Sequence, residues 1–360
     1  MLKSRWMVGV VGLSLFAPSC APAAHRPLTD TPSKIILFIA DGAGAGHWAV
    51  ARIATPDLEV NRFTALGLVD VRGWNHLVTE SAQAASALAT GERSVMGALS
   101  LSPDSVPRTT VLEIAQARGM ATGLITTTRL TDATPAAFAT HYPSRDHLQV
   151  ARQMAAQHVT VLLGGGREIF TLAPTDGAET ALAAMRQRYS YVETAEELEH
   201  LRPDTVELLL GLFAEGDMAL APERAPSLAA MTGTAIAILD REQNGFFLMV
   251  ENEETDTQAH RNQGFDVLAA EMLAFNEAIA VAVAYQRRHH ETLIIVTGDH
   301  ETGGLTVQVD STGAPTLRYT TTGHTAGLLP LFASGPGADR FRGLLGNDQV
   351  GRILRDLVQR

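Results

Sequence analysis

Short apolar runs that alternate with longer helical segments are the feature that most constrains the fold of this chain. Runs such as 34–40 (KIILFIA), 121–127 (ATGLITT) and 246–250 (FFLMV) are too short for most helices. They are followed by polar or turn residues, as is typical of strands buried on both faces. Longer Ala-rich stretches with apolar periodicity, such as 264–288, are typical of helices. The alternation predicts an α/β fold, a three-layer α/β/α sandwich with a large, mainly parallel central sheet.

Size and charge narrow the class of protein further. The 360 residues are 46% hydrophobic and 19% charged, the composition of a globular protein with a large core. We expect residues 25–360 to form a single domain, in which 167–225 is an insertion that covers the sheet. The formal net charge is −11, from 39 acidic and 28 basic residues. This balance argues against nucleic acid as a binding partner, because little positive charge is available to neutralise a phosphate backbone.

The N-terminal residues 1–24 have the pattern of an export signal. Lys3 and Arg5 precede an apolar run from Met7 to Ala17, and the small residues Ala21-Pro22-Ala23 follow. We therefore expect an exported protein, periplasmic or extracellular. Cys20, the only cysteine, lies where a lipoprotein signal would carry its acylated residue, so a membrane-anchored lipoprotein is the alternative.

Polar residues follow three of the predicted strands at the point where each strand ends. Asp41 comes after 34–40, Glu251 after 246–250, and Asp299-His300 after the apolar run in 291–297. Because the carboxyl ends of parallel strands share one edge of a sheet, these side chains can converge there. Asp41 taken alone could equally cap the following helix.

A second signal follows Glu251 in the chain. Asp256 and His260 form an Asp-x-x-x-His pattern, which on a helix places both side chains on one face, one turn apart. A carboxylate and an imidazole so placed can hold one cation, although the same pattern is common on solvated helix faces.

Ser81 precedes an Ala-rich helical segment, 82–91. It is either an ordinary helix N-cap or a nucleophile at a helix N-terminus, where free backbone N–H groups and the helix dipole favour a phosphate. The absence of a Gly-x-Ser-x-Gly elbow around Ser81 argues against the α/β-hydrolase triad.

The stretch after the second predicted strand offers oxygen ligands and a cationic fork. Asp132 and Thr134 supply hard oxygen atoms of the kind that Mg²⁺ prefers. Arg145 supplies a planar guanidinium suited to phosphate oxygens. Each of these residues could equally serve in capping or on the surface.

The convergent residues divide by ligand chemistry. The histidines His260, His300 and His324, together with carboxylates, suit zinc, whereas an oxygen-only set suits magnesium. The roles of His47 and His141 stay open.

Seven motifs in order resemble the alkaline phosphatase family over nearly all of residues 25–360. They are IADGAG at Asp41, TESA at Ser81, DATPAAFATHYPSR from 132 to 145, LLGGG at 162–166, FFLMVE through DTQAH, TGDHETGG at Asp299 and GHT at His324. The resemblance implies a single catalytic domain that hydrolyses small-molecule phosphate monoesters through a phosphoserine on Ser81. It implies two Zn²⁺ ions and one Mg²⁺ ion as cofactors, and leaves a homodimer and a lipid anchor open.

The resemblance also implies a role for each site residue. One zinc ion would be bound by Asp256, His260 and His324. The other would be bound by Asp41, Asp299, His300 and the oxygen of Ser81. Magnesium would be bound by Asp41, Thr134 and Glu251, with Asp132 holding its waters. Arg145 would clamp the phosphate.

Two positions depart from the family pattern. Glu80 stands where the best-known members have an aspartate that orients the arginine, and its extra methylene puts the placement of Arg145 in question. Thr257 stands where relatives carry lysine, histidine or tryptophan, which implies weaker holding of phosphate. The competing interpretations are a phosphodiesterase or sulfatase of the same superfamily, and an inactive phosphate-binding protein. Ser81, Thr134 and Glu251 argue against the first. An inactive protein would be expected to have lost a ligand or Ser81, and none is missing.

Overall fold

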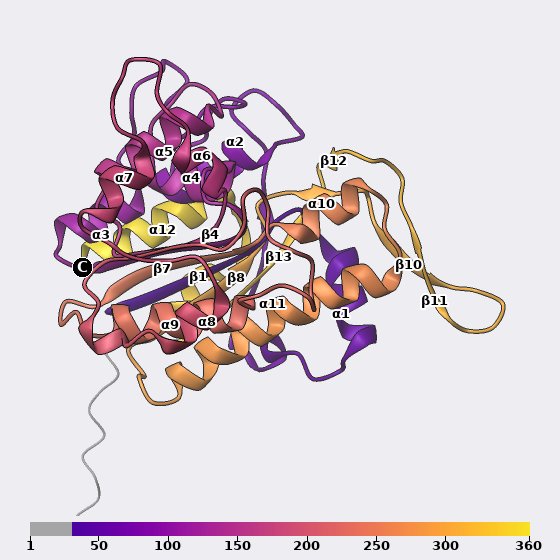
Figure 1. Ribbon diagram of the computed structural model, residues 1–360. Coiled ribbons are helices and arrows are strands. Elements are labelled where there is room, and N and C mark those ends of the chain that lie inside the picture. Colours follow the sequence, from indigo (N-terminus) through magenta and orange to yellow (C-terminus); the bar gives the residue numbers. More distant parts are fainter. Residues whose placement is uncertain (1–30) are drawn as a thin grey trace, which may run out of the picture.

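A ten-stranded sheet forms the centre of the computed structural model, which describes residues 31–360 (Figure 1). The predicted export signal and Cys20 lie outside the described residues. The strand order is β14-β2-β13-β8-β1-β7-β3-β4-β6-β5. The strands are β1 (Lys34–Ala40), β2 (Ala65–Asp70), β3 (Ala121–Arg129), β4 (Val161–Gly165), β5 (Ser190–Val192), β6 (Leu209–Leu212), β7 (Phe246–Asn252), β8 (Thr292–Thr297), β13 (Leu329–Ser334) and β14 (Gly343–Gly346).

The sheet is mainly parallel, as the alternation of strands and helices predicts. Among its described strands only β13 runs antiparallel to its neighbours, β8 and β2. Every residue of the central strands β1, β7 and β8 is buried, which explains why these strands are continuous apolar runs and do not alternate in polarity.

Helices cover both faces of the sheet, so the three-layer architecture is confirmed (Figure 1). One face is covered by α2 (Ser81–Thr90), α3 (Val111–Ala117), α4 (Ala133–Ala139), α5 (His147–Ala156), α6 (Arg167–Thr171), α7 (Ala181–Arg186) and α12 (Asn347–Gln359). The other face is covered by α1 (Ala45–Ala54), α8 (Ala195–His200), α9 (Leu228–Leu239) and α11 (Phe265–Gln286). By length and composition alone α11 could cross a membrane, but Phe275 and Ile279 pack from it into the core beneath the sheet.

Residues 167–225 both cover and extend the sheet. They contribute α6, α7 and α8, and they add β6 and β5 as the last two strands at one edge. A short 3-10 helix, η2 (Pro203–Thr205), lies between α8 and β6. Two further 3-10 helices are η1 (Glu59–Arg62) and η3 (Ala338–Phe341).

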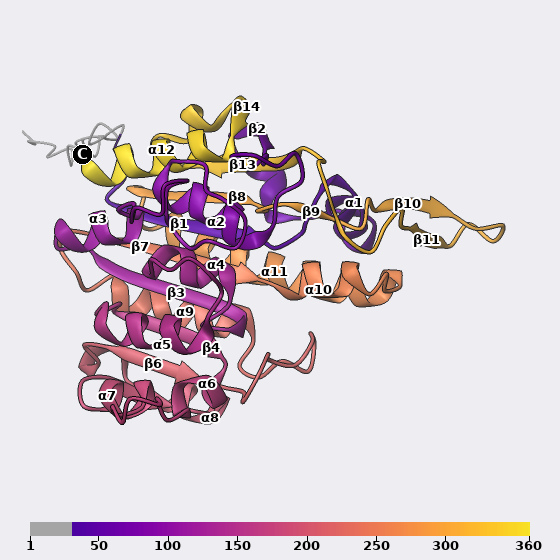
Figure 2. The ribbon, with the colours of Figure 1, turned by 90° about the horizontal axis from the view of Figure 1, so that it is seen from above.

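Short helices and strands outside the main sheet lie at the carboxyl ends of the central strands. The helix α10 (Glu254–His260) follows β7 almost at once, and β9 (Glu301–Thr302) pairs with β12 (His324–Thr325). Between these last two strands, β10 (Thr306–Val309) and β11 (Pro315–Arg318) form a hairpin that projects from the body of the molecule (Figure 2). The edge that the sequence assigns to ligands is therefore also where distant segments meet.

Candidate active site

The strand register brings the predicted ligands of β1, β7 and β8 to one place. Ile39 of β1 is paired with Glu251 on one side and with Thr297 on the other. Asp41, two residues after Ile39, and Asp299, two residues after Thr297, therefore extend from the same edge as Glu251. All three carboxylates are buried.

The first cluster, here called the histidine group, consists of Asp256, His260 and His324. Asp256 Oδ2 lies 3.1 Å from His260 Nε2, so the two residues of α10 lie on one helix face as predicted. His260 Nε2 lies 3.0 Å from His324 Nε2, and His324 Nε2 lies 3.9 Å from Asp256 Oδ1. The two imidazole nitrogens and the carboxylate face one another around a common point, as ligands of one cation would.

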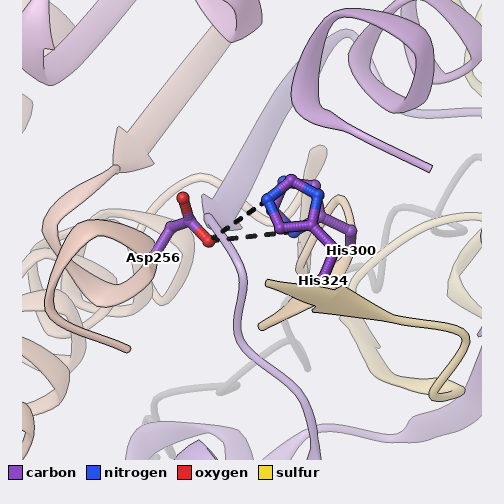
Figure 3. Close-up of side chains that lie close together, drawn as sticks. All are labelled: Asp256, His300 and His324. Carbon is purple, nitrogen blue, oxygen red and sulfur yellow. Dashed lines mark ion pairs between the residues drawn. The ribbon is translucent and has the colours of Figure 1, made fainter. Parts of the chain in front are cut away.

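The second cluster, the central group, consists of Asp41, Asp299 and His300. His300 Nε2 lies 3.3 Å from Asp41 Oδ1 and 3.4 Å from Asp299 Oδ2. The imidazole of His300 also stacks on that of His324, with 3.7 Å between ring centroids. In Figure 3 the carboxylate of Asp256 points toward these two stacked rings. His300 thus joins the two groups.

Backbone carbonyls orient two of the histidines. The carbonyl of Thr322 lies 2.5 Å from His260 Nδ1, and that of Thr79 lies 2.8 Å from His324 Nδ1. Each carbonyl can accept the Nδ1–H, which leaves Nε2 as the free lone pair of the ring. Both Nε2 atoms then face Asp256. Sequence analysis missed Thr79 and Thr322 because a backbone acceptor leaves no mark on residue type.

The third cluster, the oxygen-donor group, consists of Asp41, Thr134 and Glu251. Glu251 Oε2 accepts a hydrogen bond of 2.5 Å from Thr126 Oγ1, a contact that the sequence did not indicate. Asp132, near this group, caps α4 by accepting from the N–H of Ala133 at 2.8 Å. The capping interpretation of Asp132 is thus correct for one of its oxygens.

Three buried oxygens of these groups have no hydrogen-bond partner among the described residues. They are Asp41 Oδ1, Asp299 Oδ2 and Thr134 Oγ1. Buried polar atoms without a partner are rare and costly, and cations bound in the central and oxygen-donor groups would satisfy these three. The residues present therefore fit a metal centre, with nitrogen and oxygen donors that suit zinc and an oxygen-only set that suits magnesium.

The ionisation of the carboxylates supports the same conclusion. Burial, together with the negative charges of Asp299 and Asp256, raises the pKa of Asp41 well above its usual range. Burial also raises the pKa of Glu251 to about 8, and the charge of Asp132 adds to the shift. Carboxylates crowded in this way favour a cation among them, because it removes the repulsion that opposes their ionisation.

Ser81 is the first residue of α2, but Glu80 is the residue that caps the helix. Glu80 accepts from the N–H groups of Ala82 and Gln83, each at 2.9 Å. The interpretation of Ser81 as an N-cap is therefore wrong, and its Oγ instead lies 3.2 Å from His300 Nε2. Two of the N–H groups at this helix N-terminus, those of Ala82 and Gln83, are therefore occupied by Glu80.

Arg145 forms an ion pair with Glu80. The extra methylene of Glu80 thus does not prevent the contact. Glu80 Oε1 also accepts from the N–H of Gly97 at 2.9 Å. Burial by itself would raise the pKa of Glu80, but the charge of Arg145 and these backbone N–H groups outweigh it and lower that pKa. Arg145 is consequently held by an ionised carboxylate on the residue that precedes Ser81.

The two undecided histidines lie outside these groups. His141 contacts Glu113 at 2.9 Å and the carbonyl of Ser100 at 3.1 Å, so its role is structural. His47 in α1 is fully buried, and burial lowers its pKa to about 4. A residue that sequence analysis missed, Thr302, donates a hydrogen bond to Asp256. Its place in the TGDHETGG motif was the available signal.

Metal-ligand groups around a helix-terminal serine, with an arginine alongside, define the class of metal-dependent phosphoryl-transfer enzymes. The sequence profile of the alkaline phosphatase family matches residues 33–317. The chain belongs to this family and is a phosphomonoester hydrolase. Metal dependence is a property of the family.

Individual relatives agree with this assignment. Streptomycin-6-phosphate phosphatase of Streptomyces griseus is 32% identical, over 93% of this chain and 92% of that protein. Alkaline phosphatase 4 of Bacillus subtilis is 30% identical, over 91% and 88%.

Solved structures resemble the fold over nearly the same extent. The alkaline phosphatase of the Antarctic bacterium TAB5 has a TM-score of 0.84 at 28% identity, covering 91% of this chain and 99% of that one. A mutant of that enzyme is described with Mg bound in its M3 site. A cold-active alkaline phosphatase from Shewanella sp. has a TM-score of 0.82 at 27% identity, covering 91% and 100%.

Proposed function

We propose that this hydrolase acts through a phosphoserine on Ser81, with two zinc ions and one magnesium ion as cofactors. The observation that carries the proposal is the position of Ser81 Oγ, 3.2 Å from the nitrogen of His300 that also faces Asp41 and Asp299. A hydroxyl in that position can share a cation with the central group.

The three groups divide the metals among them. The histidine group would hold one zinc ion, and the central group together with Ser81 Oγ would hold the other. The oxygen-donor group would hold magnesium, with Asp132 binding its waters. When bound, these cations supply positive charge that lowers the pKa of a nearby hydroxyl and neutralises the oxygens on which charge develops.

The chemical work of the chain itself begins with Ser81. Its Oγ attacks phosphorus, a new O–P bond forms, and the bond to the leaving alcohol breaks on the opposite side. Arg145, held by Glu80, neutralises the non-bridging oxygens during this transfer. A water molecule then attacks the phosphoserine from the side that the alcohol has left, which releases inorganic phosphate and restores the hydroxyl.

Turnover and covalent trapping test the proposal together. Hydrolysis of p-nitrophenyl phosphate is compared with that of its bis-ester, before and after a chelator removes the metals. We expect metal-dependent turnover that strongly favours the monoester, and a phosphate on the peptide containing Ser81 after acid quenching. Turnover without phosphate on that peptide would overturn the serine intermediate, and preference for the diester would favour the phosphodiesterase alternative.

Export and anchoring remain part of the proposal. We propose that residues 1–24 direct the protein out of the cytoplasm and are then removed, with acylation of Cys20 as the alternative. Mass spectrometry of the mature N-terminus distinguishes the two outcomes. A homodimer is likewise a proposal, and sedimentation of the purified protein tests it.

A further inference from the structure

A fully buried polar network lies behind the oxygen-donor group. Asn252, Thr127 and Glu271 have no exposed surface, and Arg224 is 4% exposed. None of these residues belongs to the three ligand groups.

Asn252 is the centre of this network and is the residue after Glu251. Its Nδ2 donates to the carbonyl of Glu271 at 3.0 Å and to Glu271 Oε2 at 3.2 Å. Its Oδ1 accepts from Thr127 Oγ1 at 3.1 Å, and its main-chain carbonyl accepts from the N–H of Asp41 at 3.0 Å. One side chain and its carbonyl therefore tie together β7, the end of β3 and the end of β1, the segments that lead to all three members of the oxygen-donor group.

Glu271 in α11 is fixed in turn by a strap, defined here as residues 217–224. Glu271 Oε1 accepts from the N–H of Ala221 at 2.7 Å, and Oε2 pairs with Arg224 Nη2 at 2.8 Å. Arg224 Nε donates to the carbonyl of Ala219 at 3.0 Å. The strap also reaches β3, because the N–H of Met218 donates to the carbonyl of Thr127 at 3.1 Å. The strap belongs to the segment 167–225, in which the sequence offered no site residue.

The composition of the network indicates a role in placement more than in stability. A buried ion pair loses so much hydration that an apolar pair of similar volume is often as stable or more stable. A buried amide that uses both ends, in contrast, fixes its neighbours in one geometry. Ligands of a small, strictly octahedral cation such as Mg²⁺ need such geometry.

We propose that Asn252, held by Glu271 and Arg224, is a positioning residue that sets the geometry of the oxygen-donor group and so its affinity for magnesium. The inference rests on the proposed function, because it takes that group to be the magnesium site. Residues that orient metal ligands typically change metal affinity by about 10- to 100-fold when they are removed.

The test measures magnesium binding directly, without turnover. Zinc-loaded, magnesium-free protein is titrated with Mg²⁺ by calorimetry, zinc content is measured by mass spectrometry, and thermal unfolding is followed in the absence of Mg²⁺. The variant is Asn252→Ala, which removes the amide and keeps the main-chain carbonyl that binds Asp41. The matched control is Asn244→Ala. Asn244 lies just before β7, at the end of the strand opposite to Asn252, and its amide donates to the carbonyl of Gly119.

We expect Asn252→Ala to weaken magnesium binding about 10-fold or more while zinc content and the control stay unchanged. Unchanged magnesium affinity in Asn252→Ala would overturn the inference. So would a parallel loss of both metals that matches the loss of thermal stability, because it would indicate a merely structural role.

A double variant keeps the test decisive if Asn252→Ala does not fold. Arg224→Met combined with Glu271→Met removes both charges together, which buried pairs tolerate, and takes away one of the two acceptors of Asn252 Nδ2. The same fall in magnesium affinity would support the inference, and unchanged affinity would overturn it. A wild-type protein that binds no magnesium would instead refute the magnesium part of the proposed function.

Discussion

The histidine group and the oxygen-donor group lie beside each other at one edge of the sheet, but they differ in solvent access and in the atoms that they offer. The side chains of His260 and His324 are 37% and 17% exposed, whereas that of Asp41 is 4% exposed. Thr134 and Glu251 are buried as well. The histidine group is therefore partly exposed to solvent, whereas the oxygen-donor group is buried.

The two groups also differ in how their charges are compensated. In the histidine group, the hydrogen bond to Asp256 raises the pKa of His260 to about 8. The negative charge of Asp256 is therefore compensated by a histidine of the same group. In the oxygen-donor group, the negative charges of Asp41 and Glu251 repel each other, and no cationic side chain is among its members. The comparison teaches that the carboxylates of the oxygen-donor group gain more from a bound cation than Asp256 does, because Asp256 already has a histidine partner.

The largest expected effect comes from Ser81, whose Oγ contacts His300 and belongs to neither of the two compared groups. Replacing Ser81 with Ala should lower kcat by at least about 10³-fold, because it removes the proposed nucleophile while both groups remain. Steady-state hydrolysis of p-nitrophenyl phosphate measures it. Ser227→Ala, which removes a serine at the start of α9, is the control and should keep its activity. Comparable kcat in both variants would contradict the role of Ser81.

The second prediction concerns the histidine group, the more exposed of the two. His260→Ala should cost about one equivalent of zinc and lower kcat about 100-fold, while magnesium stays bound, because only the histidine group loses a ligand. Metal content measured after dialysis against a weak chelator checks the difference. Simultaneous loss of magnesium would mean that the two groups are not independent.

The third prediction concerns the oxygen-donor group and the dependence of protein stability on pH. Burial raises the folded-state pKa of Glu251 from 4.5 to about 8, so between these values the folded protein binds more protons than the unfolded protein does. Stability of the metal-free protein should therefore fall as pH rises from about 5 to 8, by on the order of 3 kcal/mol. Urea unfolding at several pH values measures it. Glu251→Gln should flatten the dependence, and an equally steep dependence in that variant would refute this cause.

The fourth prediction concerns Arg145, which belongs to neither group and is proposed to bind the phosphate. Glu80→Gln removes the charge that holds Arg145 and should raise KM and the inhibition constant for phosphate about 10-fold, because the guanidinium is no longer fixed. Glu80→Asp should raise KM and the inhibition constant for phosphate less than Glu80→Gln does, because it keeps the negative charge. Inhibition by inorganic phosphate measures both, and equal constants in the three proteins would exclude an orienting role for Glu80.

The smallest effect is expected at Thr257, whose hydroxyl donates to Glu253 at 2.6 Å. Thr257→Lys should lower the inhibition constant for phosphate about 3-fold, because it adds a positive charge at a position that the family resemblance places beside the phosphate. Thr257→Met is the uncharged control. An unchanged constant in Thr257→Lys would indicate that the ammonium pairs with Glu253 instead of phosphate.

The prediction of the fold succeeded because burial on both faces leaves a direct mark on sequence. A central strand such as β1 or β7 must be apolar along most of its length, and β8 repeats that pattern. The gathering of Asp41, Glu251 and Asp299 at one edge follows from parallel strands alone. The prediction missed that β5 and β6 join the sheet, because such short edge strands carry little pattern.

What the sequence by itself determined is the order of the strands' polar ends and the types of ligand that they carry, because both follow from local pattern and residue chemistry. Only the tertiary structure decided how those ligands are held. Glu80 caps the helix in place of Ser81, backbone carbonyls of Thr79 and Thr322 orient the histidines, and Asn252 reaches Glu271 across the core. These contacts join segments far apart in the chain, often through backbone atoms that every residue shares, so no local pattern could predict them.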